Sequence, residues 1–133
     1  MNYINQSNSV FILKWISIVT YLMSLCLPIG GWYDVKDYDF YGIQALFMGF
    51  IHLAWWGNIS LFCSWYWSRK DVAFSFIFAI FAVLLCLSMY LLEMTGVDTT
   101  SIGARIWLFS VIVNFLAALL SWTRKYLLGK NVW

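Results

Sequence analysis

The sequence predicts an all-α membrane protein, an up-down four-helix transmembrane bundle with both termini in the cytoplasm. Of the 133 residues, 63% are hydrophobic and 11% are charged, whereas about a quarter of the residues of a soluble domain are charged. The hydrophobic residues also gather in four long stretches, each close to the roughly 17–25 residues that cross a bilayer as a helix. Because lipid cannot satisfy backbone N–H and C=O groups, we expect each stretch to be helical.

The expected helices cover residues 10–27, 43–67, 72–94 and 106–123. Pro28 ends the first helix. The short sequence Ser68-Arg-Lys-Asp71 separates the second helix from the third and predicts an antiparallel hairpin. Ser101, like the two threonines before it, is a candidate N-cap for the last helix. Since the helices fill the chain, we expect a single transmembrane domain over residues 1–133.

Lysine and arginine residues are distributed unequally between the two sides of the predicted bundle. Six lie on the side of the termini and of the turn between the second and third helices: Lys14, Arg69, Lys70, Arg124, Lys125 and Lys130. Lys36 and Arg105 lie on the opposite side. Because basic residues accumulate in cytoplasmic segments, this distribution predicts that both termini are cytoplasmic.

Small and polar residues recur at three- and four-residue spacing within the predicted helices. In lipid, such residues mark the faces along which helices pack. The helix-packing residues expected from this pattern are Ala45, Gly49, Ala79 and Ala82. We also expect an intramembrane polar cluster of His52, Asn58, Ser110 and Asn114. These side chains can bond to one another and to neighbouring backbone, or they can serve a function, because polar groups inside a membrane are costly.

The predicted outer side carries an acidic loop that is rich in tyrosine. Tyrosine anchors many protein interfaces, so we expect partner contacts at Tyr33, Asp34, Asp37, Tyr38 and Asp39. The loop lacks the glycine and the bidentate glutamate of a calcium-binding loop. On the same side, Glu93 and Arg105 are expected to form an ion pair between the third and fourth helices, which near water is worth less than about 1 kcal/mol.

The sequence carries no pattern typical of an enzyme or a metalloprotein. Phosphate-binding, nucleophile-elbow and zinc-protease motifs do not occur in it. A single histidine, His52, provides too few ligands for zinc. Cys26, Cys63 and Cys86 form no Cys-x-x-Cys pair and lie in apolar segments. A net charge of +2 does not indicate nucleic-acid binding. We therefore expect no catalytic residue, metal, cofactor or nucleic-acid partner.

Two short motifs lie in the second predicted helix, namely Gly42-Ile-Gln-Ala-Leu-Phe-Met-Gly49 and Trp55-Trp-Gly-Asn58. They resemble the Gly-x-Gln-Ala-Leu-x-x-Gly and Trp-x-x-Asn motifs of uncharacterised small four-helix bacterial inner-membrane proteins. The resemblance implies a multi-pass protein of the bacterial inner (cytoplasmic) membrane, and it implies no activity.

The sequence favours a non-enzymatic integral membrane protein that acts by helix and loop contacts with a membrane partner. The partner is expected to be another membrane protein or a second copy of the chain. An accessory subunit fits this description, and so does an immunity protein against a membrane-active toxin, by analogy of size and helix number. The alternative is an oligomeric channel or small-molecule transporter with a polar path near His52 and Asn114. A third possibility is an enzyme subunit that holds a quinone or haem near His52.

Overall fold

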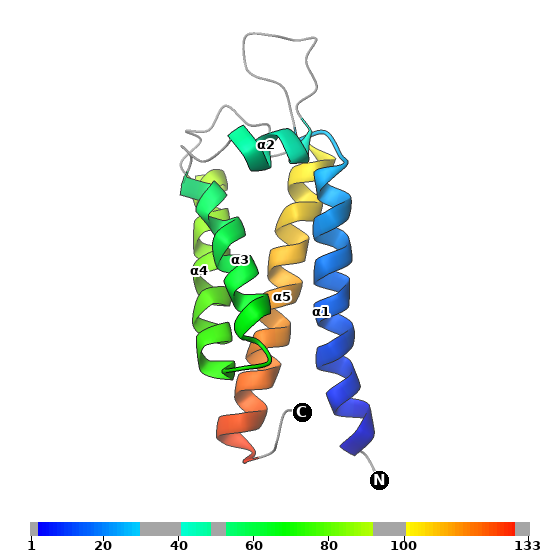
Figure 1. Cartoon of the computed structure of the whole chain (residues 1–133), viewed down its shortest axis with the longest axis vertical. Helices are drawn as coiled ribbons and strands as arrows, with labels where there is room; N and C mark the ends of the chain where they lie inside the picture. The colour runs from blue at the N-terminus through cyan, green and yellow to red at the C-terminus, as the bar shows by residue number, and fades with distance from the viewer. Residues whose placement is uncertain (1–2, 30–40, 49–52, 92–100, 130–133) are drawn as a thin grey trace.

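The computed structural model describes residues 3–29, 41–48, 53–91 and 101–129, and these residues are mostly helical. Helices α1 (Tyr3–Leu25), α3 (Trp56–Trp67), α4 (Val72–Leu91) and α5 (Ile102–Leu127) lie side by side (Figure 1). Helix α2 (Gly42–Met48) lies across one end of them, and the short 3-10 helix η2 (Leu53–Trp55) leads into α3. The prediction of a helical protein is confirmed.

Two helices have the length and composition needed to cross a membrane. They are α1, over Asn8–Leu25, and α5, over its whole length. Helix α4 contains a shorter apolar stretch, Val72–Ser88. These helices agree with the predicted membrane protein.

The second predicted helix, over residues 43–67, is not one straight helix. In its place are α2, η2 and α3, and α2 runs across the direction of α3 (Figure 1). The Gly42 N–H donates to the Leu27 carbonyl at 3.0 Å, and the indole N–H of Trp55 donates to the Leu46 carbonyl. These bonds fasten both ends of α2 to other segments. Hydropathy stays high through the change of direction, so the sequence pattern does not show it.

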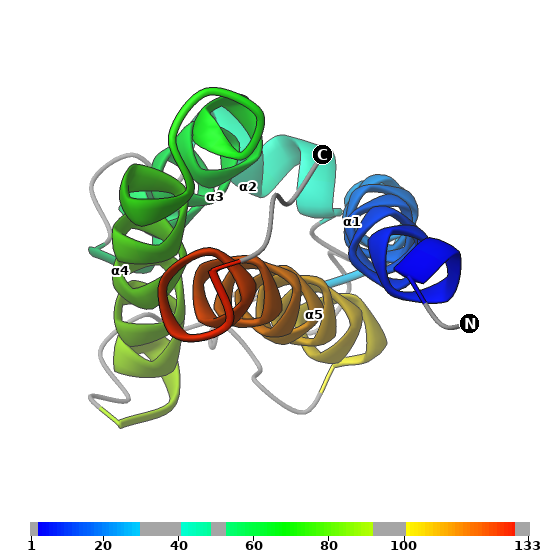
Figure 2. The same ribbon diagram turned by 90° about the horizontal axis from the view of Figure 1, so that it is seen from below.

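The helices pack in the order α1, α5, α4, α3 around the molecule (Figure 2). Side chains from all of them enclose a small core of buried residues, namely Tyr21, Leu61, Ala82, Cys86 and Val111. Helix α4 also packs on α5 through stacked rings, in which the centroid of Phe76 lies 5.9 Å from Phe115 and 5.4 Å from Trp122. Every helix of the side-by-side group therefore has at least one neighbour with which it shares buried contacts.

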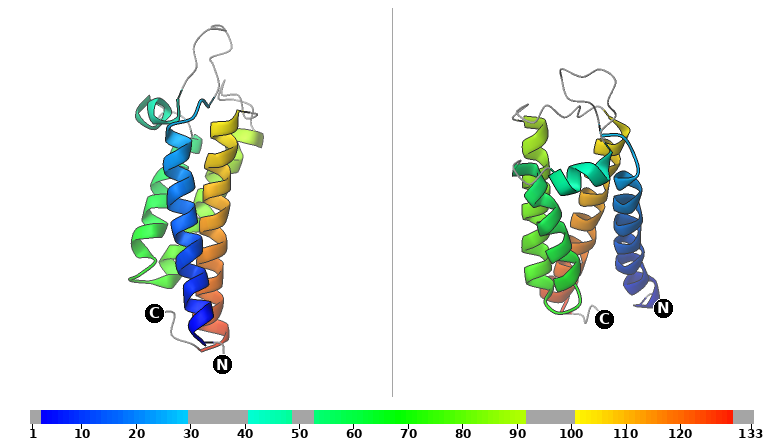
Figure 3. Two further views of the ribbon diagram at one scale, coloured as in Figure 1. Left: turned by 90° about the vertical axis from the view of Figure 1, so that its right-hand side faces the viewer. Right: turned by 45° about the horizontal axis from the view of Figure 1, so that its top comes forward.

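Two glycines bring the end of α1 against the starts of α2 and α5 (Figure 3). Gly103 N–H donates to the Pro28 carbonyl at 3.1 Å, next to the Gly42 bond to Leu27. A Cβ at Gly103 would lie 2.5 Å from the same Pro28 oxygen, so only glycine allows this approach. These two bonds give N–H groups of the first turns of α2 and α5, which have no acceptor within their own helices, a carbonyl partner in the segment that follows α1.

Side-chain caps fix the starts of α4 and α5. Residues 68–71 connect α3 and α4, where the sequence predicts the turn, and Asp71 Oδ1 accepts a hydrogen bond from Ala73 N–H at 2.8 Å. At α5, Ser101 Oγ accepts from Ala104 N–H at 3.3 Å. Ser101 is one of the expected caps, and both caps satisfy backbone donors of a first helical turn.

Candidate functional site

Two pairs of buried serines join neighbouring helices by reciprocal hydrogen bonds. Between α1 and α5, Ser17 Oγ donates to the Ser110 carbonyl and Ser110 Oγ donates to the Ser17 carbonyl, each at 2.9 Å. Between α3 and α4, Ser64 and Ser75 form the same pair of bonds, again at 2.9 Å. Small side chains allow this close approach of two backbones, and each buried hydroxyl has an acceptor without water.

Asn114 connects the second serine pair to α5. Its side chain is 2% exposed, and its Nδ2 donates to Ser64 Oγ at 2.9 Å. The Ser64 hydroxyl accepts this bond while it donates to the Ser75 carbonyl. Helices α3, α4 and α5 therefore meet in one chain of buried hydrogen bonds.

A second amide side chain, Asn58, joins α3 to α5 nearer the α2 end. Asn58 is 8% exposed, and its Oδ1 accepts a hydrogen bond from Trp107 Nε1 at 2.8 Å. This bond supplies the acceptor that the indole N–H of a partly buried tryptophan needs.

The predicted polar cluster is thus divided among several contacts. Asn58, Ser110 and Asn114 are all buried, but each bonds to a residue outside the predicted set rather than to another member. His52 lies outside the described residues. The three described side chains link helices, and their hydrogen bonds are made within one chain.

The expected packing residues differ in how far they are buried. Ala79 and Ala82 of α4 are fully buried, whereas Ala45 of α2 is half-buried and Gly49 lies outside the described residues. Gly57 of α3 is a packing residue that the spacing of small residues did not indicate, and a Cβ there would lie 2.9 Å from Cys86 Sγ. The feature of the sequence that could have indicated this contact is a glycine, which has no side chain, directly before the polar Asn58.

Aromatic side chains form the described ring contacts between α1 and α3. The ring centroid of Tyr21 lies 5.3 Å from that of Phe62 and 5.5 Å from that of Trp65. Tyr21 is 2% exposed, and its hydroxyl and the Trp65 Nε1 are buried without a hydrogen-bond partner among the described residues. The spacing of small and polar residues along α1 allows either Thr20 or Tyr21 on the inward face of the helix, and the structure buries Tyr21 there. Trp65 follows Asn58 by seven residues, which is the spacing that places both on one face of α3.

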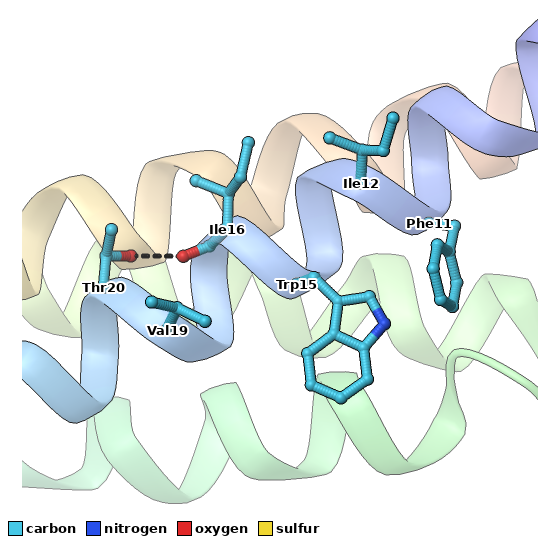
Figure 4. Close-up of a pocket in the computed structure, with 6 residues that line it drawn as sticks. All are labelled: Phe11, Ile12, Trp15, Ile16, Val19 and Thr20. Carbon is cyan, nitrogen blue, oxygen red and sulfur yellow. Dashed lines mark hydrogen bonds between the residues drawn. The ribbon is translucent and has the colours of Figure 1, made fainter.

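The side of α1 that points away from α5 is apolar and slightly hollowed (Figure 4). The hollow is lined by Phe11, Ile12, Trp15, Ile16, Val19 and Thr20. Phe11 and Trp15 are about half exposed. The Thr20 hydroxyl donates to the Ile16 carbonyl at 2.7 Å, so that this polar group is satisfied within α1.

The end of the molecule that carries the 68–71 turn is basic. Arg69 and Lys70 are exposed, and the Lys70 ammonium lies 3.9 Å from the centroid of the Tyr66 ring. The carboxylate in this turn, Asp71, caps α4. Two cations on one short turn therefore give this end a positive potential.

Further cations lie at the same end of the molecule (Figure 1). Arg124 and Lys125 belong to the last turn of α5, and the Lys125 ammonium is 5.2 Å from the ring centroid of Tyr126. Lys14, which the sequence assigns to the same side, lies at the middle of α1, and its ammonium is buried. The basic end, defined by Arg69, Lys70, Arg124 and Lys125, thus draws on the 68–71 turn and on the last turn of α5.

The opposite end, formed by α2, exposes apolar side chains. Tyr41 is 44% exposed, Ile43 50% and Phe47 75%. Arg105 is also exposed near this end, and its predicted partner Glu93 lies outside the described residues. The predicted contact residues of the acidic loop lie outside them as well: Tyr33, Asp34, Asp37, Tyr38 and Asp39.

In the part of the chain that the structure describes, no group of three or more His, Cys, Asp or Glu side chains could hold a metal ion. Comparisons with protein-family models, curated proteins and solved structures found no match. The function is therefore inferred from the contacts of this chain alone.

Proposed function

We propose that the chain is a four-helix integral protein of the bacterial inner membrane that acts by contact with another membrane protein at the α2 end. The proposed bundle consists of α1, α3, α4 and α5, with both termini in the cytoplasm. An accessory subunit and an immunity protein against a membrane-active toxin both belong to this class. The most exposed described large apolar side chain, Phe47 of α2, carries the proposal of a partner contact.

The distribution of residue size supports the membrane placement. On α4, Ala79 and Ala82 are fully buried, while Phe74, Phe81 and Leu84 are 50–58% exposed. The same division, with small or polar residues inside and bulky apolar residues outside, holds on α5. Helices associate in lipid through small residues and interhelical hydrogen bonds. A surface of bulky apolar side chains is costly in water and favourable in a bilayer.

Charge and length support the orientation. The basic end would face the cytoplasm, because basic residues gather on that side of a membrane. Helix α3 has 12 residues and η2 has three, which together rise about 24 Å, less than the roughly 30 Å of a hydrocarbon core. Placing α2 flat at the outer interface would fill the remaining depth.

Three neighbouring side chains support a partner contact at the α2 end. Tyr41, Ile43 and Phe47 are all at least 44% exposed, and aromatic side chains are enriched among interface anchors. The sequence places the tyrosine-rich acidic loop directly before Tyr41. The loop and α2 together would form one continuous contact surface.

The buried polar residues support a non-enzymatic role. Ser110 and Asn114 hold helices of one chain together, which is what a stable scaffold in lipid requires. The oligomeric channel with a path near His52 and Asn114 has less support, because its described members already bond within the chain.

Site-specific photocrosslinking in native membranes tests the contact. A photoreactive residue at position 47 should give a discrete protein adduct, while the same residue at Phe81 of α4, which is 52% exposed, should give none. Phe47→Ala should abolish co-purification of the crosslinked protein in mild detergent, whereas Phe81→Ala should not. Identical adducts at both positions, or lipid adducts alone at position 47, would contradict the proposal.

A toxin-protection assay separates the two partner types. If the chain is an immunity protein, its deletion should make cells sensitive to the membrane-active toxin encoded beside it. The wild-type chain should restore resistance and Phe47→Ala should not. If the chain is an accessory subunit, deletion should leave toxin sensitivity unchanged and reduce the recovery of the crosslinked partner from membranes.

A further inference from the structure

We propose that the contact between α1 and α3 is a binding site for a neutral, flat ligand with carbonyl acceptors, a quinone by chemical class, which Tyr21 and Trp65 hold by hydrogen bonds. The site lies away from the partner contact at α2, and the inference goes beyond the proposed function. Three observations support it: two buried donors that lack an acceptor, an exposed ring that covers them, and the uncharged, aromatic character of the contact.

Tyr21 and Trp65 bring two buried hydrogen-bond donors to one contact. Their ring centroids lie 5.5 Å apart at an interplanar angle of 84°. The Tyr21 hydroxyl and the Trp65 Nε1 are both buried, and within the described part of the chain neither bonds to the other or to any other group. The buried side chains of Ser64 and Asn114, by contrast, have partners. Buried donors without acceptors are rare, because each has given up its hydrogen bonds to water. Two of them in one contact indicate a place where an acceptor binds.

The ring of Phe62 covers the two donors. Its centroid lies 5.3 Å from that of Tyr21 and 5.5 Å from that of Trp65, and Phe62 is 39% exposed, the most of the three. Exposed side chains change rotamer rapidly. An outward rotation of Phe62 would open a space of about one ring beside both donors.

This rotation leaves the hydrogen bonds of the serine pairs in place. Those pairs join α1 to α5 and α3 to α4, whereas α1 and α3 are the first and last helices in the order around the molecule (Figure 2). The contact between α1 and α3 can therefore admit a ligand without loss of either serine pair. In the proposed membrane placement, the ligand would enter from the bilayer.

The chemistry of the contact selects a neutral and flat acceptor. An indole N–H only donates, and a tyrosine hydroxyl can donate as well, so the ligand has to supply acceptor atoms. Three aromatic side chains form the contact, and a charged acceptor among them would lose its hydration at high cost. Aromatic rings pack favourably with centroids about 4.5–7 Å apart. A quinone combines a flat ring with carbonyl oxygens and carries no charge.

Equilibrium dialysis of the full-length protein in mild detergent tests the site with two matched probes. Duroquinone is a methylated benzoquinone, and durene is a benzene ring with the same number of methyl groups and no carbonyl. The ring of duroquinone is fully substituted, so the exposed thiol of Cys26 does not add to it. Retention is measured relative to micelles without protein. We expect duroquinone to bind at least about tenfold more tightly than durene, as two hydrogen bonds imply.

Three substitutions test the roles of the individual side chains. Tyr21→Phe removes the hydroxyl and keeps the ring, and it should weaken duroquinone binding about fivefold, the factor that corresponds to a hydrogen bond of about 1 kcal/mol, without changing durene binding. Trp65→Phe should have a similar effect. The matched control is Tyr126→Phe, at a 50% exposed tyrosine of α5, which should bind both probes as the wild type does. Phe62→Ala removes the covering ring and should tighten the binding of duroquinone. Circular dichroism of each variant verifies folding.

Several outcomes would overturn the site. Equal retention of duroquinone and durene, equal effects of Tyr21→Phe and Tyr126→Phe, or weaker duroquinone binding in Phe62→Ala would each do so. If Tyr21→Phe does not fold, the comparison of the two probes on the wild type and on Trp65→Phe still decides. These measurements do not involve α2, so failure of the quinone site leaves the crosslinking test at Phe47 unaffected, and the reverse holds as well.

Discussion

Replacing Gly57 with alanine should strain the contact between α3 and α4 through a single atom. The new Cβ would lie 2.9 Å from Cys86 Sγ, while the next atoms, the Ala82 carbonyl oxygen and Cys86 N, would be at 3.4 and 3.5 Å. The latter distances are ordinary contacts, so the sulfur alone obstructs the methyl group. Cys86 is fully buried, and adding a methyl group to a packed core costs about 1–3 kcal/mol.

A double-mutant cycle isolates this clash from other effects of the substitution. In a Cys86→Ala background the sulfur is gone, and Gly57→Ala meets no atom closer than 3.4 Å. Alanine also stabilises a helix relative to glycine by up to about 1 kcal/mol, but this gain is the same in both backgrounds and cancels in the cycle. We expect a coupling free energy of about 1–2 kcal/mol, with the double variant more stable than additivity predicts.

The free energy of unfolding can be measured by titrating sodium dodecyl sulfate into mixed micelles and following helicity by circular dichroism. The four proteins of the cycle are compared under one set of conditions. Effects of the two substitutions that add within about 0.5 kcal/mol would refute the reasoning, because uncoupled sites show additivity of that quality.

Two further substitutions test the junctions of the helices in the same unfolding assay. Gly103→Ala should destabilise the protein by about 2 kcal/mol or more, because its Cβ would crowd the Pro28 carbonyl oxygen. The control is Ile102→Ala, at a neighbour that is 57% exposed, which should change stability by less than about 0.5 kcal/mol. Equal effects of the two substitutions would contradict the close approach of Gly103 to Pro28. Asp71→Ala should cost about 1 kcal/mol by removing the cap on Ala73, and Asp71→Asn should retain most of it. An alanine variant as stable as the asparagine variant would show that the cap does not act.

The inward faces of the helices could be predicted from the sequence, but their partners could not. Spacing of small and polar residues indicated Ala79, Ala82, Ser110 and Asn114, all of which are buried. Which side chain meets which depends on the order of the helices around the molecule, and a periodic pattern contains no information about that order. The bond of Ser110 to Ser17 joins residues 93 positions apart.

The course of the chain near α2 escaped prediction for a different reason. Apolar residues continue through the segment, and hydropathy cannot register a change of direction. The change depends on backbone contacts that only the folded chain brings together, such as Gly42 N–H with the Leu27 carbonyl. The candidate contact at Phe47 likewise follows from where α2 lies, since the residue would otherwise be read as one more apolar position of a spanning helix.

Reporter fusions at two positions give the most direct measurement of the proposed membrane topology. Alkaline phosphatase, which is active only outside the cytoplasm, and green fluorescent protein, which is fluorescent only inside it, are each fused after Lys70 and after Thr99. The proposed bundle predicts fluorescence without phosphatase activity after Lys70, and phosphatase activity without fluorescence after Thr99. The same reporter active at both positions would contradict a membrane crossing by α4 and, with it, the four-helix transmembrane bundle.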